Sequence, residues 1–459
     1  MLGVDNTSLH RGLGTNSIVF MVLAAAAPIT VVAANFPIIF MESHSAGAPL
    51  MILCAALILL LFSVGFVKMV PLVPEAGAFY SYVEKGLGTR LGMGTAGIAL
   101  FSYILLTVSM TCYLGVQSSN LILTTTGLPL PWWSLSLFMI VIVGLLGYRD
   151  IELSAKVLGA VLVLEVLAVL ILDSGILFTA PHLSLRPFSP TEALSGAPGL
   201  GLLFAFLGFF GFEATAVFRH EAKDPERVIP RATFLAVIFI GVFYTISAWL
   251  VANGIGVNQV AMDSTKDPEN IIMDLASGVV TPLLGDIMRI LVVTSMFACM
   301  LSFHNICSRY LFSLAQRRVL WAQLGVVHPR HHAPSNASLG SSFLCLLIVL
   351  GSAVAGLDPV TEIYTWYSGA GALGVIVMMV LCCAAVLWFF ARQHQQSRSW
   401  LVFPSLGGVG LLGVFAVSLA YLPMMTGGIT PAVCTVSALT ICFLLGGLVS
   451  FQHKPAGKR

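Results

Sequence analysis

Charged residues are scarce in this sequence. Asp, Glu, Lys and Arg make up 9% of the 459 residues and hydrophobic residues 58%, whereas a soluble domain has about 25% charged residues. This composition excludes an ordinary soluble enzyme, and the net charge of +2 gives no reason to expect a nucleic-acid partner. Because a bilayer-spanning helix needs about 20 apolar residues, we expect an all-α membrane protein in contact with the lipid bilayer.

The sequence also lacks the motifs of several enzyme and cofactor classes. It contains no P-loop, HExxH motif or Ser/His/Asp pairing, and the GxGxxG match at Gly92 opens an apolar segment with no strand before it. The nine cysteines lie in apolar segments without metal-type spacing. We therefore expect neither an enzyme nor a resident metal or cofactor, and we interpret the cysteines as small apolar residues.

Long apolar runs are what the chain has instead, and they predict twelve transmembrane helices. The runs cover residues 18–40, 46–70, 93–121, 132–146, 157–178, 198–218, 232–251, 290–312, 339–354, 363–390, 401–421 and 429–451. Twelve spans put both termini on one side of the membrane. If that side is the cytoplasm, all but three of the 22 Lys and Arg residues lie on it, the exceptions being Arg186, Lys266 and Arg289.

We therefore expect a multi-pass protein of the plasma membrane, the inner membrane in a bacterium, with both termini cytoplasmic. A signal peptide ending in the alanines before Pro28 is the alternative for the first run, but the apolar character continues past that residue. No oligomeric state is predicted.

Two of the predicted helices are interrupted near mid-depth. Pro28 lies inside the first run, and Gly208 and Gly211 lie inside the sixth. Proline removes a backbone hydrogen bond, and the freed groups must find partners in the membrane. Because the first and sixth runs each open a block of five, the matched interruptions indicate a transporter built from two inverted repeats. The alternative is a simple kink at Pro28 and glycines that allow close helix packing.

Four stretches carry a resemblance to a known family. The more specific two are PEAGAFYSYVEKGLG at 74–88 and FGFEATAVFRHEAKDPERVIPRA at 210–232; the weaker two are SRYLFSLAQRRVL at 308–320 and VVHPRHHAPSNA at 326–337. The sequence resembles the amino acid, polyamine and organocation transporters over essentially its whole length. The resemblance implies a LeuT-type fold, with two inverted repeats of five helices, two further C-terminal helices and alternating access around one central site.

This fold implies the following organisation. The cytoplasmic N-terminus covers 1–16, and the transporter core covers 17–395, with repeats at 17–180 and 197–395. Helices 11 and 12 cover 396–452, and the cytoplasmic C-terminus covers 453–459.

The resemblance also indicates a substrate site at the two interruptions. The family usually has a Gly-small-Gly triplet in helix 1, where this sequence has Pro28, Ile29 and Thr30; some putrescine importers of the family also have Pro-x-Thr. The helix that starts after Pro28 would direct free N–H groups and a positive dipole end at a substrate carboxylate. The remaining expected substrate-binding residues are Gly208, Phe209, Phe210, Gly211, Phe212 and His304.

Only two acidic residues are expected well inside the apolar segments, Glu165 and Glu213. A carboxyl at mid-membrane is costly and must be protonated, paired or in contact with water. The resemblance implies that several proton-coupled members carry a lysine at the position that matches Glu165, so our hypothesis is a proton-coupling role for this residue. A permanently neutral structural glutamate is the alternative. For Glu213 the alternatives are a coupling or substrate-binding role and an internal acceptor for the broken helix.

A run of charged residues follows the sixth helix, and within it we interpret Glu221 and Arg231 as an inner gate; a solvated loop is the alternative. These features together predict a secondary active transporter for amino acids, coupled to protons, with sodium as the alternative ion. A polyamine or amine importer or exchanger of the same family is the alternative function. A channel or a transporter-like nutrient sensor is a more distant one.

Overall fold

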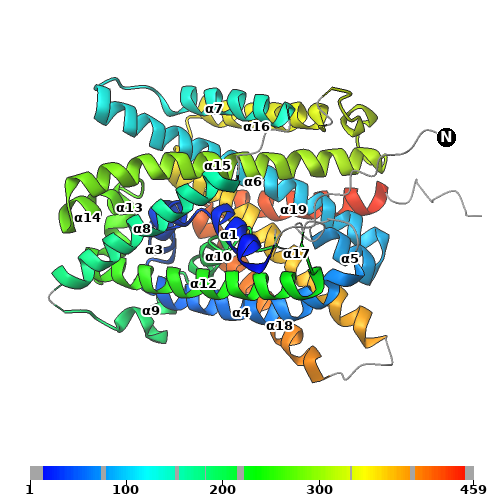
Figure 1. Cartoon of the computed structure of the whole chain (residues 1–459), viewed down its shortest axis with the longest axis horizontal. Coiled ribbons are helices and arrows are strands. Elements are labelled where there is room, and N and C mark those ends of the chain that lie inside the picture. The colour runs from blue at the N-terminus through cyan, green and yellow to red at the C-terminus, as the bar shows by residue number, and fades with distance from the viewer. Residues whose placement is uncertain are drawn as a thin grey trace, which may run out of the picture.

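The computed structural model describes residues 14–73, 79–149, 155–180, 182–213, 215, 222–330, 333–392 and 399–449. Within these residues all regular structure is helical and there is no β-strand. Figure 1 shows long helices, among them α4, α12 and α15, running roughly along the longest axis of the molecule.

The first part of the chain forms ten helical segments. These are α1 (Thr15–Ala25), α2 (Pro28–Thr30), the π-helix η1 (Val31–Asn35), α3 (Phe36–Ser43), α4 (Ala48–Met69), the 3-10 helix η2 (Val70–Leu72), α5 (Phe79–Leu87), α6 (Thr89–Thr126), α7 (Trp132–Tyr148) and α8 (Ala155–Thr179).

The second part contributes the remaining segments. These are η3 (Arg186–Phe188), α9 (Pro190–Ala193), α10 (Pro198–Leu207), α12 (Pro225–Ile255), α13 (Val260–Lys266), α14 (Ile271–Val279), α15 (Pro282–Gln316), η5 (Ala322–Gly325), α16 (Ser335–Val354), the π-helix η6 (Pro359–Tyr364), α17 (Thr365–Ala391), η7 (Ser399–Leu401), α18 (Val402–Met425) and α19 (Ile429–Val449).

Ten helices in the described residues are long and apolar enough to cross a membrane, and they coincide with ten of the twelve predicted runs. The fourth and sixth runs form shorter apolar helices, α7 with 17 residues and α10 with 10. Helix α10 is short because it ends at Leu207 and the chain continues as turns through 208–213. The chain is thus a multi-pass membrane protein.

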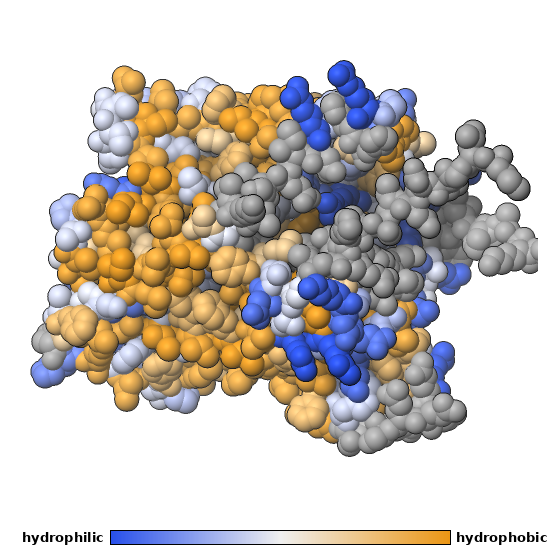
Figure 2. Space-filling view, in the orientation of Figure 1, coloured by the Kyte–Doolittle hydropathy of each residue, from blue (hydrophilic) through white to orange (hydrophobic). Residues whose placement is uncertain are grey.

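The outer surface is apolar where lipid would contact it. Figure 2 shows hydrophobic residues over much of the front face, where α8 and α12 lie, and hydrophilic residues gathered towards the right-hand end. Large exposed side chains on these two helices include Leu164, Leu167, Leu170, Leu235, Ile238, Val242 and Ile246. In a soluble protein such a face would need a partner, but in a bilayer the lipid covers it.

Helix α6 packs against α15, α17 and α19 as well as its chain neighbours α5 and α7. The GxGxxG match opens this helix, and its glycines serve packing. A Cβ at Gly97 would lie 2.2 Å from the carbonyl oxygen of Cys442 on α19, and one at Gly446 would lie 2.3 Å from that of Met93. Small residues let two membrane helices approach this closely. All nine cysteines lie in the described part of the chain and are free, and most are buried, which agrees with their expected role.

Candidate functional site

The first helix is broken rather than kinked. Helix α1 ends at Ala25, and Ala27 adopts the left-handed conformation with φ 48° and ψ 68° before α2 begins at Pro28. Proline is favoured as the first residue of a helix, because the N–H group that it lacks would have no partner there. The interruption predicted at Pro28 is therefore present, and it separates α1 from the continuous stretch formed by α2, η1 and α3.

A carboxyl group faces the start of this second stretch. The N–H group of Ile29 donates to Oε2 of Glu165 on α8, with a distance of 3.4 Å. The first N–H groups of a helix have no partner within it, and the helix dipole favours a negative group at this end. The buried side chain of Glu165 thus lies at the start of α2, where the sequence predicts that a substrate carboxylate binds.

Helix α15 completes this polar cluster with Ser295. The hydroxyl of Thr30 donates to Oγ of Ser295 at 3.0 Å, and the Ser295 hydroxyl also interacts with the Glu165 carboxyl. Three helices, α2, α8 and α15, therefore meet at Glu165, Thr30 and Ser295, all of which are buried. Sequence reasoning missed Ser295, whose only signal is a small hydroxyl inside an apolar run.

The second break lies beside the first. The side-chain amide of Asn35, the last residue of η1, donates to the carbonyl oxygen of Phe204 on α10 at 2.8 Å. A Cβ at Gly208 would lie 3.2 Å from Cγ1 of Val31. Asn35 thus joins η1 to α10, and a π-helical turn such as η1 is a feature often found at functional sites. The structure brings the two predicted interruptions together.

Glutamate 213 braces the second break from inside. After α10 the chain turns through 208–213, and Gly211 has φ 106°, a conformation that favours glycine. Oε2 of Glu213 accepts from the N–H group of Gly211 at 2.9 Å, and Oε1 accepts from the hydroxyl of Tyr103 on α6 at 3.0 Å. These contacts are those of an internal acceptor for the broken helix, one of the two alternatives for Glu213.

The phenylalanines of the second break pack against neighbouring helices. The ring centroid of Phe209 lies 6.4 Å from that of Tyr244 on α12. The ring of Phe212 lies 6.1 Å from that of Phe62 on α4. Phe210 is buried in the same turn. At least two of the three rings therefore help to hold the break between α12 and α4.

His304 does not join this cluster. Its Nε2 lies 2.8 Å from Oγ of Ser342 on α16, and a Cβ at Gly147 on α7 would lie 3.2 Å from its Nδ1. His304 follows Ser295 by nine residues, which is about two and a half helical turns, so the two side chains leave α15 on opposite faces. Ser295 contacts the first break, whereas His304 contacts α7 and α16.

The expected gate pair is only partly described. Arg231 is exposed on the second turn of α12, and Glu221 lies outside the described residues. A different ion pair joins α5 to the end of α15. The guanidinium of Arg317 lies 2.7 Å from Oε2 of Glu84 on α5. Arg317 also lies over the ring of Tyr80, 5.6 Å from its centroid. Sequence reasoning missed this pair.

One further carboxyl is buried in the spans. Asp173 on α8 is 6% exposed and accepts from the Ser247 hydroxyl of α12 at 2.6 Å. The expectation that only Glu165 and Glu213 lie well inside the apolar segments was therefore wrong. Asp173 was not predicted to be buried because it lies near the end of the apolar run 157–178, where a carboxyl is expected to reach water. In the described part of the chain, no group of three His, Cys, Asp or Glu side chains could hold a metal ion.

Comparison with known proteins identifies the family. A family described as "Amino acid permease" matches residues 13–449. The chain is 22% identical to the low-affinity putrescine importer PlaP of Escherichia coli over 204 residues, which are 43% of this chain and 44% of PlaP. It is 26% identical to the aromatic amino acid permease FywP of Lactococcus lactis over 274 residues, 58% of this chain and 56% of FywP.

A third relative is matched over more of its length. The branched-chain amino acid permease BcaP of Bacillus subtilis is 22% identical over 338 residues, 69% of each chain. The chain thus spans about half the length of PlaP and FywP and about two thirds of BcaP. Permeases are transporters and not enzymes. With a family match that runs from the first broken helix to α19, the chain belongs to the amino acid permease family.

Proposed function

We propose that this chain is a secondary active transporter for amino acids that binds its substrate between the two helix breaks. The observation that carries the proposal is the pairing of these breaks: Asn35 bonds to α10 at 2.8 Å, and Val31 packs against Gly208. Broken helices present backbone donors and acceptors that an unbroken helix keeps for itself. The start of α2, which Glu165 contacts in this structure, would suit a substrate carboxylate in place of Glu165, and the turn after α10 offers carbonyl groups for an amine.

The proposed architecture has twelve spans in two inverted repeats, at 17–180 and 197–395, followed by helices 11 and 12 at 396–452. Support comes from the ten spanning-length helices, from the two shorter ones at the fourth and sixth positions, and from the breaks at corresponding places. Both termini are proposed to be cytoplasmic in a bacterial inner membrane, as the distribution of Lys and Arg favours. Glu221 and Arg231 stay our proposal for a gate on that side.

The proton is our proposed coupling ion, with Glu165 as its carrier. When ionised, the carboxylate accepts hydrogen bonds from Ile29 of the first break and from Ser295 of α15. Protonation removes its negative charge from the start of α2 and weakens these bonds, because hydrogen bonds to charged groups are the stronger ones. Loading a proton therefore loosens α8 from helix 1, the helix that we propose moves during transport. We do not include His304 in the site, because it contacts α7 and α16.

Transport of a diamine is the second candidate function. It is favoured by the Pro-x-Thr sequence at Pro28 and Thr30 and by the similarity to a protein named as a putrescine importer. An amine without a carboxylate would use the acidic groups at the breaks and would leave the start of α2 to Glu165.

The test uses purified protein reconstituted in liposomes. A thermal-shift screen with amino acids, putrescine and cadaverine first identifies a ligand; stabilisation that needs both a carboxylate and an α-amine supports the first function, and stabilisation by diamines alone supports the second. Uptake of that ligand is then measured with and without an imposed inward proton gradient. We expect Glu165→Gln to abolish stimulation by the gradient while exchange without it persists.

Asp173→Asn is the matched control, since it removes another buried carboxyl from the same helix that does not contact the breaks. It should keep the stimulation. Undiminished stimulation in Glu165→Gln would refute the assignment of Glu165.

A further inference from the structure

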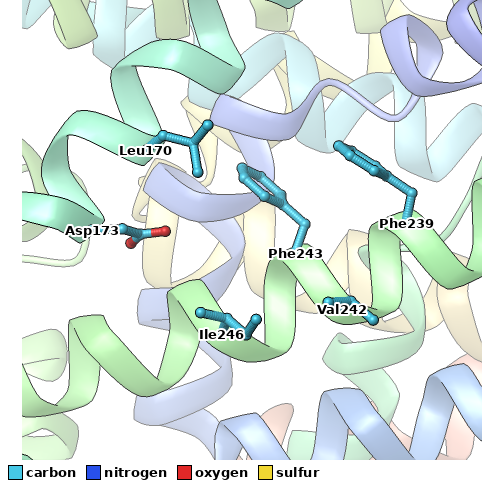
Figure 3. Close-up of a pocket in the computed structure, with 6 residues that line it drawn as sticks. All are labelled: Leu170, Asp173, Phe239, Val242, Phe243 and Ile246. Carbon is cyan, nitrogen blue, oxygen red and sulfur yellow. The ribbon is translucent and has the colours of Figure 1, made fainter.

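A pocket of about 200 Å³ opens between α8 and α12 (Figure 3). It is lined by Leu170, Asp173, Phe239, Val242, Phe243 and Ile246. At its rim, Leu170 is 45% exposed, Val242 53% and Ile246 47%. These side chains belong to the apolar face that lipid covers, so the pocket opens to the lipid phase.

A carboxyl group forms the polar part of this apolar pocket. Oδ2 of Asp173 accepts from the Ser247 hydroxyl, whereas Oδ1 is buried and has no hydrogen-bond partner among the described residues. Figure 3 shows the carboxyl pointing from α8 into the space between the two helices. A buried acceptor without a partner is costly, and here the opening of the pocket lets a molecule from the lipid phase supply the missing donor.

No cation of the described chain neutralises this carboxyl along the two helices. The nearest described basic residue of α12, Arg231, precedes Ser247 by 16 residues, which is about 24 Å along a helix. The described side chains of α8 include no Lys or Arg. A bound cation would supply the charge that the described side chains of these two helices do not.

The walls of the pocket determine which apolar groups the bound molecule can carry. The rings of Phe239 and Phe243 stack with centroids 5.7 Å apart and planes within 11°, and aromatic faces attract cations as well as hydrocarbon. A cavity of about 150 Å³ suffices for benzene. The pocket therefore has room for a small polar head and a few carbon atoms, and a longer chain can leave through the lipid-facing rim.

We propose that this pocket binds a primary amine dissolved in the membrane, with its ammonium group on Asp173 and its alkyl chain along Phe243 and Leu170. The site is separate from the helix breaks and does not depend on the function proposed above. Its walls are nevertheless the helices that contact the first break, through Glu165 on α8 and through the hydroxyl of Tyr244 on α12, 3.5 Å from the carbonyl oxygen of Ala26.

The test measures saturable binding of tritiated octylamine to the protein in lipid nanodiscs, after subtraction of its partition into empty nanodiscs. We expect one site per chain and at least a tenfold loss of affinity in Asp173→Asn. Ile246→Trp fills the pocket from its lipid-facing rim and should also abolish binding. Since its side chain is half exposed to lipid, this variant leaves the protein core intact.

Leu235→Trp is the matched control, because Leu235 lies on the same helix, is 49% exposed and is not part of the pocket. It should bind octylamine as the unchanged protein does. Equal binding by Ile246→Trp and Leu235→Trp would place the amine elsewhere, including at the helix breaks, and would overturn the proposal. Displacement of octylamine by octanol at equal concentration would also overturn it, because an alcohol carries no positive charge.

Discussion

The backbone N–H group of Ile29 donates a hydrogen bond to the carboxyl of Glu165, which lies 136 residues further along the chain. The bond joins the start of the second half of helix 1 to the middle of α8. A movement of helix 1 away from α8 would break this bond, and the bond is stronger when Glu165 is ionised.

Thr30→Val should destabilise the protein by removing the hydroxyl that bonds to Ser295. The two side chains have nearly the same shape, so the loss is that of one buried hydrogen bond, about 0.5–1.5 kcal/mol. Thr30→Ser should retain most of the stability. Thermal unfolding of the purified protein measures both. Thr294→Val is the control, because that hydroxyl bonds only to its own helix; an equal effect there would contradict the prediction.

Tyr103→Phe should weaken the second helix break. The variant keeps the ring that stacks on Tyr310, with centroids 5.7 Å apart, and loses the hydroxyl that donates to Glu213. A buried acceptor that loses its donor costs about 1–3 kcal/mol. A lower midpoint of thermal unfolding is the expected result.

Tyr310→Phe provides the comparison, since the Tyr310 hydroxyl is buried without a hydrogen-bond partner in the described structure. Its removal should leave stability unchanged or raise it. The opposite order of the two variants would show that the bond to Glu213 does not brace the break.

The pair of Glu84 and Arg317 should contribute measurably to stability. Both side chains are partly buried, and their nearest atoms lie 2.7 Å apart. A double-mutant cycle with Glu84→Gln and Arg317→Gln should give a coupling energy of about 1 kcal/mol, the upper end for surface pairs. The same cycle for Asp224 and Arg227, which are 3.7 Å apart and exposed, should give none. An equally large coupling energy for Asp224 and Arg227 would show that the short distance and partial burial of Glu84 and Arg317 do not strengthen their interaction.

Glu269→Gln should stabilise the protein at neutral and alkaline pH. Burial raises the pKa of Glu269, and the carboxylates of Asp267 and Asp358 raise it further. An acid with a raised pKa in the folded state stabilises the fold when protonated, and this contribution disappears as the pH rises through the folded pKa. Glutamine imitates the protonated form at every pH.

The measurement is the midpoint of thermal unfolding between about pH 4 and pH 8. This range runs upward from near the ordinary glutamate pKa and so covers a raised value. The advantage of Glu269→Gln should grow with pH and vanish in acid. Asp286→Asn, which removes an exposed carboxyl, should show no such trend. An advantage of Glu269→Gln that grows in acid would reverse the sign and refute the argument.

The sequence predicted the features that depend on local chemistry. Apolar runs predicted the spanning helices, because a helix in lipid has to be apolar along about 20 residues. Pro28 predicted the first break, because proline has no N–H group, and Gly208 and Gly211 predicted the second, because glycine weakens a helix. In the structure Gly211 adopts positive φ.

The sequence could not predict which polar residues meet. Thr30 and Ser295 are 265 residues apart, and no local pattern pairs them. His304 was predicted as a site residue because it is polar. Which face of a helix a residue occupies depends on its spacing from a residue known to contact the site. The sequence does not show that Ser295 is such a residue, so the face of His304 could not be predicted. The burial of Asp173 could not be predicted either, because it depends on α12 covering this turn of α8.

The left-handed residue at the first break has a consequence for the mechanics of helix 1. Ala27 holds φ 48° without the freedom of glycine, at a cost of about 1–2 kcal/mol, while the ring of Pro28 forbids a straight helix through the same point. Helix 1 therefore cannot run straight through these two residues. Contacts from neighbouring helices, such as that of the Tyr244 hydroxyl with the carbonyl oxygen of Ala26, hold the angle between its two parts.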